Sequence, residues 1–110
     1  MTWIRGDLVT AVVPGDFGKP RPVVIVQADA FMEYHASVTV CPLTTHRTGL
    51  HLFRITVSPD KHNGLNEPSE IMVDKLSSLR RERLGSSIGR LSVRDLRAVD
   101  DALRQWLALG

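Results

Sequence analysis

One arginine in this sequence is held in a way that suits the binding of an anion at a fixed position. Arg21 stands between Pro20 and Pro22, after a glycine-containing turn and before the apolar run Val23–Val26. Proline fixes its own φ and biases the residue before it towards extended backbone, so Arg21 is presented on a stiff segment. A guanidinium can clamp a phosphate or carboxylate with two parallel hydrogen bonds. The alternative is that Arg21 caps a strand end or makes an ordinary ion pair.

A second group of polar side chains follows the predicted strand Ser37–Thr44. Thr44, Thr45 and His46 stand where this strand ends. A threonine hydroxyl can donate a hydrogen bond or pass a proton, and a histidine can exchange protons near neutral pH. The alternative for His46 is a solvent-exposed side chain at a strand end, without a chemical role.

The motifs of several common enzyme classes are missing. The chain has no G-x-G-x-x-G, no P-loop, no G-x-S-x-G and no H-E-x-x-H. Its four histidines are scattered, at His35, His46, His51 and His62. We therefore expect neither a metal site nor a cofactor.

The single cysteine, Cys41, excludes an internal disulfide and a cysteine metal cluster. Because Cys41 stands in an apolar run, we expect a small buried side chain in a reducing compartment.

The 110 residues predict a single domain, spanning residues 1–110, built mainly of β-strands. Strands are predicted at Asp7–Val13, Arg21–Ala28, Ser37–Thr44, Leu52–Val57, Glu70–Val73 and Ser87–Leu91. Residues 29–36 fit either a short helical turn or an irregular connection, and Ser77–Leu84 fits one helical turn. The short strands predict a small, strongly bent sheet or barrel.

Three local patterns add detail to this prediction. The run Val23–Val26 lacks alternation, which favours burial on both faces. Pro42 cannot donate to a ladder, so its strand should bulge, end or lie at an edge there. Ser92 and Asp95 have capping-box spacing, and an apolar stripe at 3.6-residue period predicts a helix from there to near Gly110.

Positive charge is concentrated in one part of the chain. The net charge is +2, but the segment Lys75–Arg97 holds seven basic and two acidic residues. Such a segment can attract nucleic acid, an acidic partner or an anionic membrane, and can equally be an ordinary solvated face. The sequence shows no signal-peptide core at Met1–Asp7 and no run of about 18 apolar residues, so we expect a cytoplasmic protein without a membrane span.

In their order along the chain, several segments resemble the MazF/PemK (Kid) toxins. The more specific ones are the G-x-x-R-P-hydrophobic motif in Gly18–Gln27 and the strand-end threonine in Val40–Thr45. The others are Arg5–Val9, Gly64–Leu65, Ser69–Leu76, Arg83–Leu84 and Ile88–Ser92 with the terminal helix. The resemblance covers nearly the whole chain.

This resemblance implies a toxin of a type II toxin–antitoxin module, with an SH3-like barrel of the CcdB/MazF kind and a C-terminal helix. Such toxins form homodimers, bind a cognate antitoxin protein and cut single-stranded RNA at short sequences without a metal. The 2′-hydroxyl attacks the adjacent phosphate and leaves a 2′,3′-cyclic phosphate. The family's catalytic positions fall on Arg21 and Thr44. The predicted substrate-binding residues are Lys19, Thr45, His46, Asp74, Lys75, Arg80 and Arg81.

The sequence departs from the family pattern in two places. The turn Pro14–Lys19 is short where many members have a longer loop, and the second arginine of the Kid branch falls near Met72. Two alternative functions stay open. One is a gyrase-binding toxin like CcdB, although the Trp-Gly-Ile end of those proteins is replaced here by Trp106–Gly110. The other is a barrel that binds without catalysis.

Overall fold

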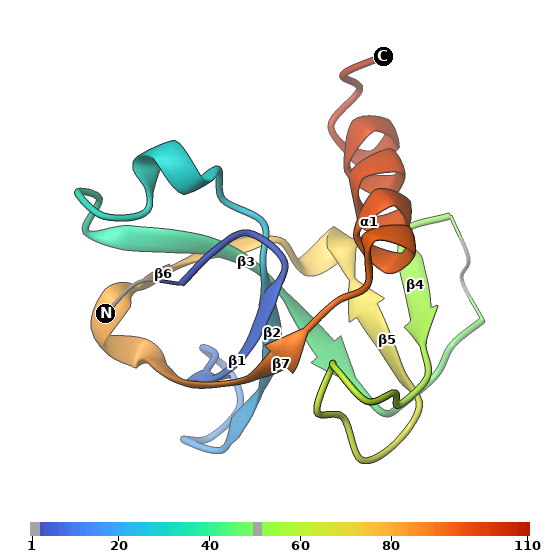
Figure 1. Cartoon of the computed structure of the whole chain (residues 1–110), viewed down its shortest axis with the longest axis horizontal. Coiled ribbons are helices and arrows are strands. Elements are labelled where there is room, and N and C mark those ends of the chain that lie inside the picture. Colours follow the sequence, from blue (N-terminus) through green and yellow to red (C-terminus); the bar gives the residue numbers. More distant parts are fainter. Residues whose placement is uncertain (1–2, 50–51) are drawn as a thin grey trace.

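A strongly bent antiparallel sheet and one α-helix make up the molecule (Figure 1). The computed structural model describes residues 3–49 and 52–110. In these ranges the strands are β1 (Asp7–Val12), β2 (Pro20–Ile25), β3 (Ser37–Thr44), β4 (Arg54–Val57), β5 (Ser69–Met72), β6 (Ser77–Arg80) and β7 (Leu84–Arg90). The helix is α1 (Val93–Trp106), and three single 3-10 turns are η1 (Asp29–Phe31), η2 (Val73–Lys75) and η3 (Arg81–Arg83). The predicted mainly-β fold with a C-terminal helix is confirmed.

β3 is the strand that joins the two parts of the sheet. The strand order is β4-β5-β3-β2-β1-β7, and β6 pairs with the first half of β3. Along the edge opposite β2, β3 pairs with β6 as far as Val40 and with β5 from Leu43 onwards. Pro42 lies in the gap between these two partners, so the strand continues to Thr44 although Pro42 has no N–H to donate.

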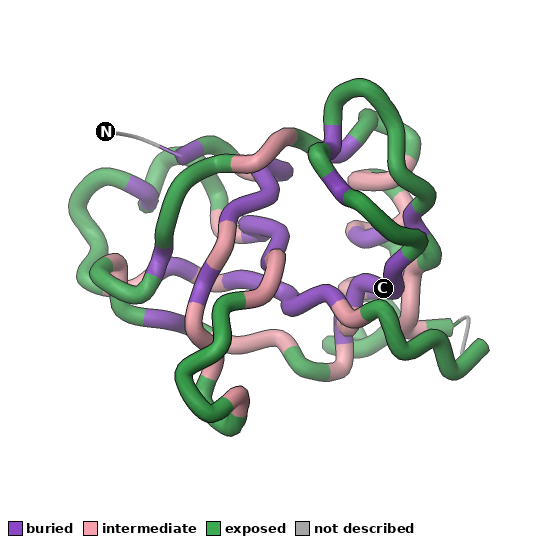
Figure 2. Tube along the Cα trace, turned by 90° about the horizontal axis from the view of Figure 1, so that it is seen from below, coloured by how far each residue is buried: buried purple, intermediate pink, exposed green. Residues whose placement is uncertain are grey.

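Apolar side chains pack on both faces of the central strands. Successive residues of a strand point to opposite faces, so Val24 and Cys41 join one cluster while Val23 and Val40 join another. The first cluster includes residues of α1, and the second is closed by Trp3, Met32, Leu79 and Leu84. Figure 2 shows the buried positions gathered towards the middle of the molecule and the exposed ones mostly around its outside. The predicted burial of the Val23–Val26 run on both faces is confirmed.

Cys41 lies inside the first cluster, as predicted, with no exposed surface. Burial raises the pKa of its thiol to about 12, so the thiolate that would react with oxidants is not formed near neutral pH.

The terminal helix begins as its sequence predicts and ends earlier. The Ser92 hydroxyl accepts a hydrogen bond from the Asp95 N–H at 3.0 Å, which caps the first turn. Val99 and Ala102 face the core, whereas the end of the helix at Trp106 is partly exposed. No helix in residues 3–49 and 52–110 has the length and apolar character needed to cross a membrane.

The predicted helical turn at Ser77–Leu84 is wrong for its first half. Ser77–Arg80 form β6, and the helical turn is confined to η3. Leu79 is buried and pairs with Val38 of β3, so burial of this leucine across the sheet outweighs the local pattern.

Smaller differences concern the limits of elements. β4 begins at Arg54 rather than Leu52, and β7 begins at Leu84 rather than Ser87. η1 is the helical alternative predicted within residues 29–36. His51 lies outside the described residues.

Candidate functional site

The ladder between β2 and β3 stops just before Arg21. Its last pair joins Val23 to Pro42. Two more residues along this register, Arg21 would face Thr44. The pairing with β2 instead ends, while β3 continues to Thr44 paired with β5 on its other edge. The fold thus places the two predicted catalytic residues on either side of an opening between neighbouring strands.

A proline explains why this ladder ends. The Val26 N–H donates to the Thr39 carbonyl at 3.1 Å, and every second residue of a strand directs its N–H to the same neighbour. Position 22 would therefore donate to β3, but Pro22 has no N–H. Arg21 supplies the missing donor, since its Nη1 donates to the Leu43 carbonyl at 3.2 Å.

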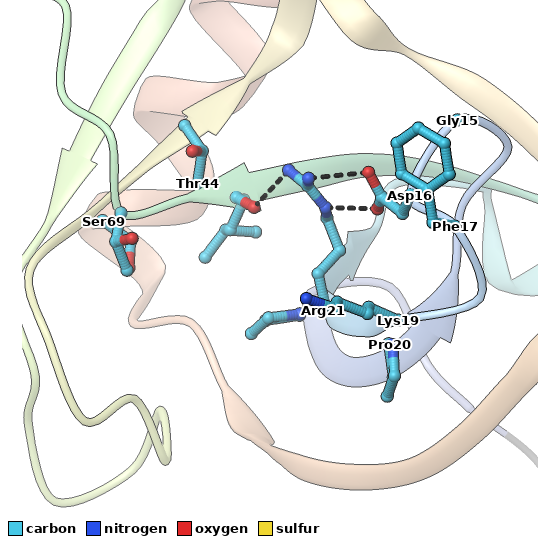
Figure 3. Close-up of a pocket in the computed structure, with 11 residues that line it drawn as sticks. Gly15, Asp16, Phe17, Lys19, Pro20, Arg21, Thr44 and Ser69 are labelled. Carbon is cyan, nitrogen blue, oxygen red and sulfur yellow. Dashed lines mark hydrogen bonds and ion pairs between the residues drawn. The ribbon is translucent and has the colours of Figure 1, made fainter.

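A cavity of about 520 Å³ lies at this opening (Figure 3). Four of the predicted site residues line it together, namely Lys19, Arg21, Thr44 and Thr45. The other lining residues are Gly15, Asp16, Phe17, Pro20, Pro22, Leu43 and Ser69. The hairpin turn between β1 and β2 thus provides one wall, and the ends of β3 and β5 provide the other.

Asp16 holds the Arg21 guanidinium from the turn. Arg21 Nε donates to Asp16 Oδ2 at 2.5 Å, and Nη2 donates to Oδ1 at 2.8 Å. The ion pair that the sequence left as an alternative is therefore present. An arginine has five N–H donors, and the bonds to Asp16 and Leu43 use three of them. One N–H on each of Nη1 and Nη2 has no partner among the described residues, and these can meet an anion in the cavity.

Thr44 keeps its hydroxyl proton available. The backbone N–H of His46 donates to Thr44 Oγ1 at 3.1 Å. The hydroxyl oxygen is therefore an acceptor within the protein, and its own proton can be donated outwards. The His46 side chain is exposed and lines a neighbouring cavity with Thr45 and Glu70 rather than the cavity of Arg21.

The predicted substrate-binding residue Asp74 is already paired. Arg54 donates to both of its carboxylate oxygens, at 2.6 and 2.9 Å. These bonds hold the pKa of Asp74 below its ordinary value. Arg54 lies directly opposite Met72 in the β4–β5 register, the position near which the Kid branch carries its second arginine. Asp74 and Lys75 line a cavity that also touches Arg21, so both lie beside the site.

Glu70 is a buried carboxylate that the sequence analysis did not single out. It accepts from the backbone N–H groups of Thr48 and Gly49, each at 3.0 Å, and from the Thr48 hydroxyl at 3.1 Å. Arg54 lies 3.8 Å away. Burial raises the pKa of Glu70, but these hydrogen bonds and the arginine outweigh burial and leave it below its ordinary value. Glu70 thereby ties the segment that follows Thr44 to β5.

Arg80 and Arg81 lie at the opposite end of β3. Arg80 pairs with Ser37, seven residues from Thr44, which is about 23 Å along a strand. The Arg81 guanidinium lies 5.1 Å from the Trp3 ring and donates to main-chain carbonyls of the segment after η1. The chain does not bring these two arginines to the cavity, and their contact with substrate stays a prediction.

In residues 3–49 and 52–110, no three histidine, cysteine or acidic side chains are grouped so that they could hold a metal ion. The paired carboxylates described above are held by Arg21 and Arg54 instead.

Comparison with known protein families gives a match along almost the entire chain. Residues 4–107 match the family described as PemK-like, MazF-like toxin of type II toxin–antitoxin system. The chain belongs to this family. It is 42% identical over 107 residues to a protein named probable endoribonuclease MazF from Mycolicibacterium smegmatis. That alignment covers 96% of this chain and 97% of the relative.

Other members of the PemK/MazF family agree in sequence and in structure. Endoribonuclease MazF3 of Mycobacterium tuberculosis is 34% identical over 85 residues, covering 77% of this chain and 80% of the relative. The solved structure of Mycobacterium tuberculosis toxin MazF-mt6 superimposes with a TM-score of 0.82 at 29% identity, covering 94% of this chain and 98% of that one. A mycobacterial endoribonuclease in complex with its cognate antitoxin has the same fold, with a TM-score of 0.80 at 21% identity and coverage of 98% and 97%.

Proposed function

We propose that this PemK/MazF protein is the toxin of a type II toxin–antitoxin module and cuts single-stranded RNA at the cavity between Arg21 and Thr44. The observation that carries the proposal is that Arg21 and Thr44 line one cavity at the point where the β2–β3 ladder ends. The naming of the 42% identical relative as a probable endoribonuclease supports it.

The reaction we propose uses a nucleophile that RNA itself carries. The 2′-hydroxyl gives its proton to solvent water as its oxygen attacks the adjacent phosphorus. The bond from phosphorus to the 5′-oxygen breaks, this oxygen takes up a proton, and the products are a 2′,3′-cyclic phosphate and a 5′-hydroxyl. Arg21 binds the phosphate through the donors that Asp16 and Leu43 leave available, and stabilises the charge that grows on its oxygens. The need for the 2′-hydroxyl makes RNA rather than DNA the substrate.

Thr44 completes the site from β3. Its hydroxyl donates a hydrogen bond to a phosphate oxygen, or passes its proton to the leaving 5′-oxygen and takes one back from solvent water. Arg21 does not act as a base, because its pKa exceeds about 12. Lys19 and Thr45 line the same cavity and contact the flanking part of the RNA.

The same proposal includes the partners of the toxin. The antitoxin would be an acidic, extended peptide that lies over the exposed Arg80 and Arg83. The mycobacterial structure with its cognate antitoxin supports such a partner. We also propose a homodimer and a cytoplasmic site of action. The partly exposed Trp106, with Leu107 and Leu109 beyond it, supports an apolar contact face at the end of α1.

The test is cleavage of a long single-stranded RNA by the purified protein in EDTA, with the new 5′ ends mapped by primer extension. We expect cuts at one recurring short sequence, with 5′-hydroxyl ends that polynucleotide kinase labels directly. Arg21→Ala should lower the rate at least about 100-fold, whereas Arg94→Ala, which removes an exposed arginine of α1, should leave it unchanged. Intact RNA with the folded wild-type protein would overturn the function, and cleavage by folded Arg21→Ala would overturn the site.

A further inference from the structure

Phe17 leaves its aromatic ring almost wholly in water. The residue is 98% exposed, although it lines the cavity of Arg21. A buried phenylalanine contributes a large apolar area to a core, and this ring contributes none. The folded chain therefore does not use Phe17 for packing.

The backbone at Phe17 also disfavours this residue type. Its φ is 54°, and that of Gly18 is 79°. The Lys19 N–H donates to the Asp16 carbonyl at 3.0 Å, so Phe17 and Gly18 are the two central residues of a tight turn. Positive φ at both centres is the pattern of a type I′ turn, where asparagine and glycine are preferred. The turn itself would form more easily with Asn or Gly at position 17.

Hydrogen bonds hold this turn beside the Arg21 guanidinium, the group that would bind an anion. Asp16 makes two hydrogen bonds to Arg21, so the residue before Phe17 is fixed to the guanidinium. In Figure 3 the guanidinium lies between Thr44 on one side and Asp16 with Phe17 on the other. A phosphate held by Arg21 would therefore have an exposed ring within reach of its neighbouring nucleotide.

We propose that Phe17 is a stacking platform for the base next to the phosphate held by Arg21. Unpaired bases stack on aromatic side chains, and a cation beside the ring holds the adjoining backbone. The arrangement favours single-stranded RNA, because a base within a duplex would first have to unpair and unstack, which costs free energy, to meet the ring. This inference rests on the proposed function of the cavity as an RNA site, and adds to it the subsite for a base.

A protein partner fits this ring less well. Surfaces that dock proteins expose several apolar side chains together. Phe17 is the one exposed large apolar side chain among the described residues that line this cavity, and its neighbours there include the charged Asp16, Lys19 and Arg21. A single ring among charges matches a nucleotide, which offers one flat base and one phosphate.

The experiment measures binding of an RNA oligonucleotide that carries the mapped cleavage sequence and a 2′-deoxy sugar at the cut, so that it binds without being cut. Phe17→Asn suits the left-handed backbone, so its thermal midpoint should equal or exceed that of the wild type. Its Kd for this RNA should nevertheless rise about tenfold. Phe17→Tyr should restore most of the affinity. Phe31→Ala, which removes a 64% exposed ring far from the cavity in η1, should not alter Kd.

The base itself is tested with oligonucleotides that carry one abasic position on either side of the cut. At one position, loss of the base should weaken binding to the wild type about tenfold and hardly weaken binding to Phe17→Asn. If wild-type protein binds and cuts RNA but Phe17→Asn has an unchanged Kd, the stacking role is wrong while the proposed function stands. The role is equally wrong if Phe17→Asn loses affinity only for the antitoxin. If the wild type neither binds nor cuts RNA, the function itself fails.

Discussion

The Thr44 hydroxyl is oriented by its own chain. Because its oxygen accepts the N–H of His46, the hydroxyl proton is directed away from that N–H. A methyl group and a hydroxyl share the same carbon in threonine, so the shape of this side chain and its donor can be tested separately.

Thr44→Ser should keep the cleavage rate within about tenfold of the wild type, and Thr44→Val should lower it about 100-fold or more. Serine retains the donor, while valine retains the shape and loses the donor, a change that typically costs this much where charge develops in the transition state. Initial rates on the mapped RNA give the comparison, with circular dichroism to confirm that both variants fold. A valine variant as active as the serine variant would remove Thr44 from the chemistry.

Residues of the site differ in how far the sequence reveals them. The positions of Arg21 and Thr44 are predictable, because Arg21 lies near the start of one strand and Thr44 at the end of another, and the apolar residues of both strands predict them. The ion-pair partner of Arg21 is not predictable from the sequence, because the chain has several acidic residues. Only the folded turn between β1 and β2 brings Asp16 to Arg21. Arg54 likewise meets Asp74 only through the register of β4 on β5, which short strands do not specify by themselves.

At the scale of elements, close backbone contacts hold the connection after β4 against β7. Gly64 has φ 68°, and a Cβ there would lie 2.0 Å from the Ile88 carbonyl oxygen. On the other side of this contact, the Arg90 N–H donates to the His62 carbonyl at 2.8 Å. The segment and the strand can approach this closely because neither Gly64 nor Gly89 of the strand carries a side chain.

Gly64→Ala should therefore lower the free energy of unfolding by at least about 2 kcal/mol more than Gly49→Ala. Gly49 is the matched control, since its φ of 76° carries the same left-handed penalty while no atom of the described residues lies within 4 Å of its added Cβ. Urea unfolding of both variants measures the difference. Equal losses would show that β7 moves aside at no cost.

Element predictions succeed or fail for a related reason. The capped start of α1 and the strand at Ser37–Thr44 follow from patterns within a few residues. β6 does not, since Ser77–Arg80 becomes a strand only by burying Leu79 against Val38 of a distant segment. Local preference fixes an element where no distant partner competes with it.

For the molecule as a whole, two carboxylates link stability to pH. The pKa values of Asp74 and Glu70 lie below their ordinary values in the folded state. The unfolded chain then binds more protons than the folded one as the pH falls, so protonation favours unfolding. The stabilisation is complete above the unfolded values of about 4 and is lost as the pH falls through the lower folded values.

As far as these two carboxylates determine it, the urea concentration at the unfolding midpoint should be constant above about pH 5 and should fall below about pH 4. Arg54→Met should lower the unfolding free energy at pH 7 by about 3 kcal/mol, because it leaves two largely buried carboxylates without their cation. The same variant should have a shallower acid dependence, since the pKa values of both carboxyls move back up. Arg94→Met is the control on α1. An unchanged acid profile in Arg54→Met would place the pH dependence elsewhere.

The prolines of β2 have a consequence for how the protein meets its substrate. Beyond their last pair, β2 and β3 could in principle form further backbone hydrogen bonds and close the space between them. Pro22, and Pro20 at the position that would oppose Thr45, offer no N–H for that closure. The opening between β2 and β3 therefore follows from the covalent structure of two prolines, and needs neither a lid nor a bound molecule to keep it open. A single-stranded RNA that arrives by diffusion could enter this opening directly, because β2 and β3 do not have to separate first.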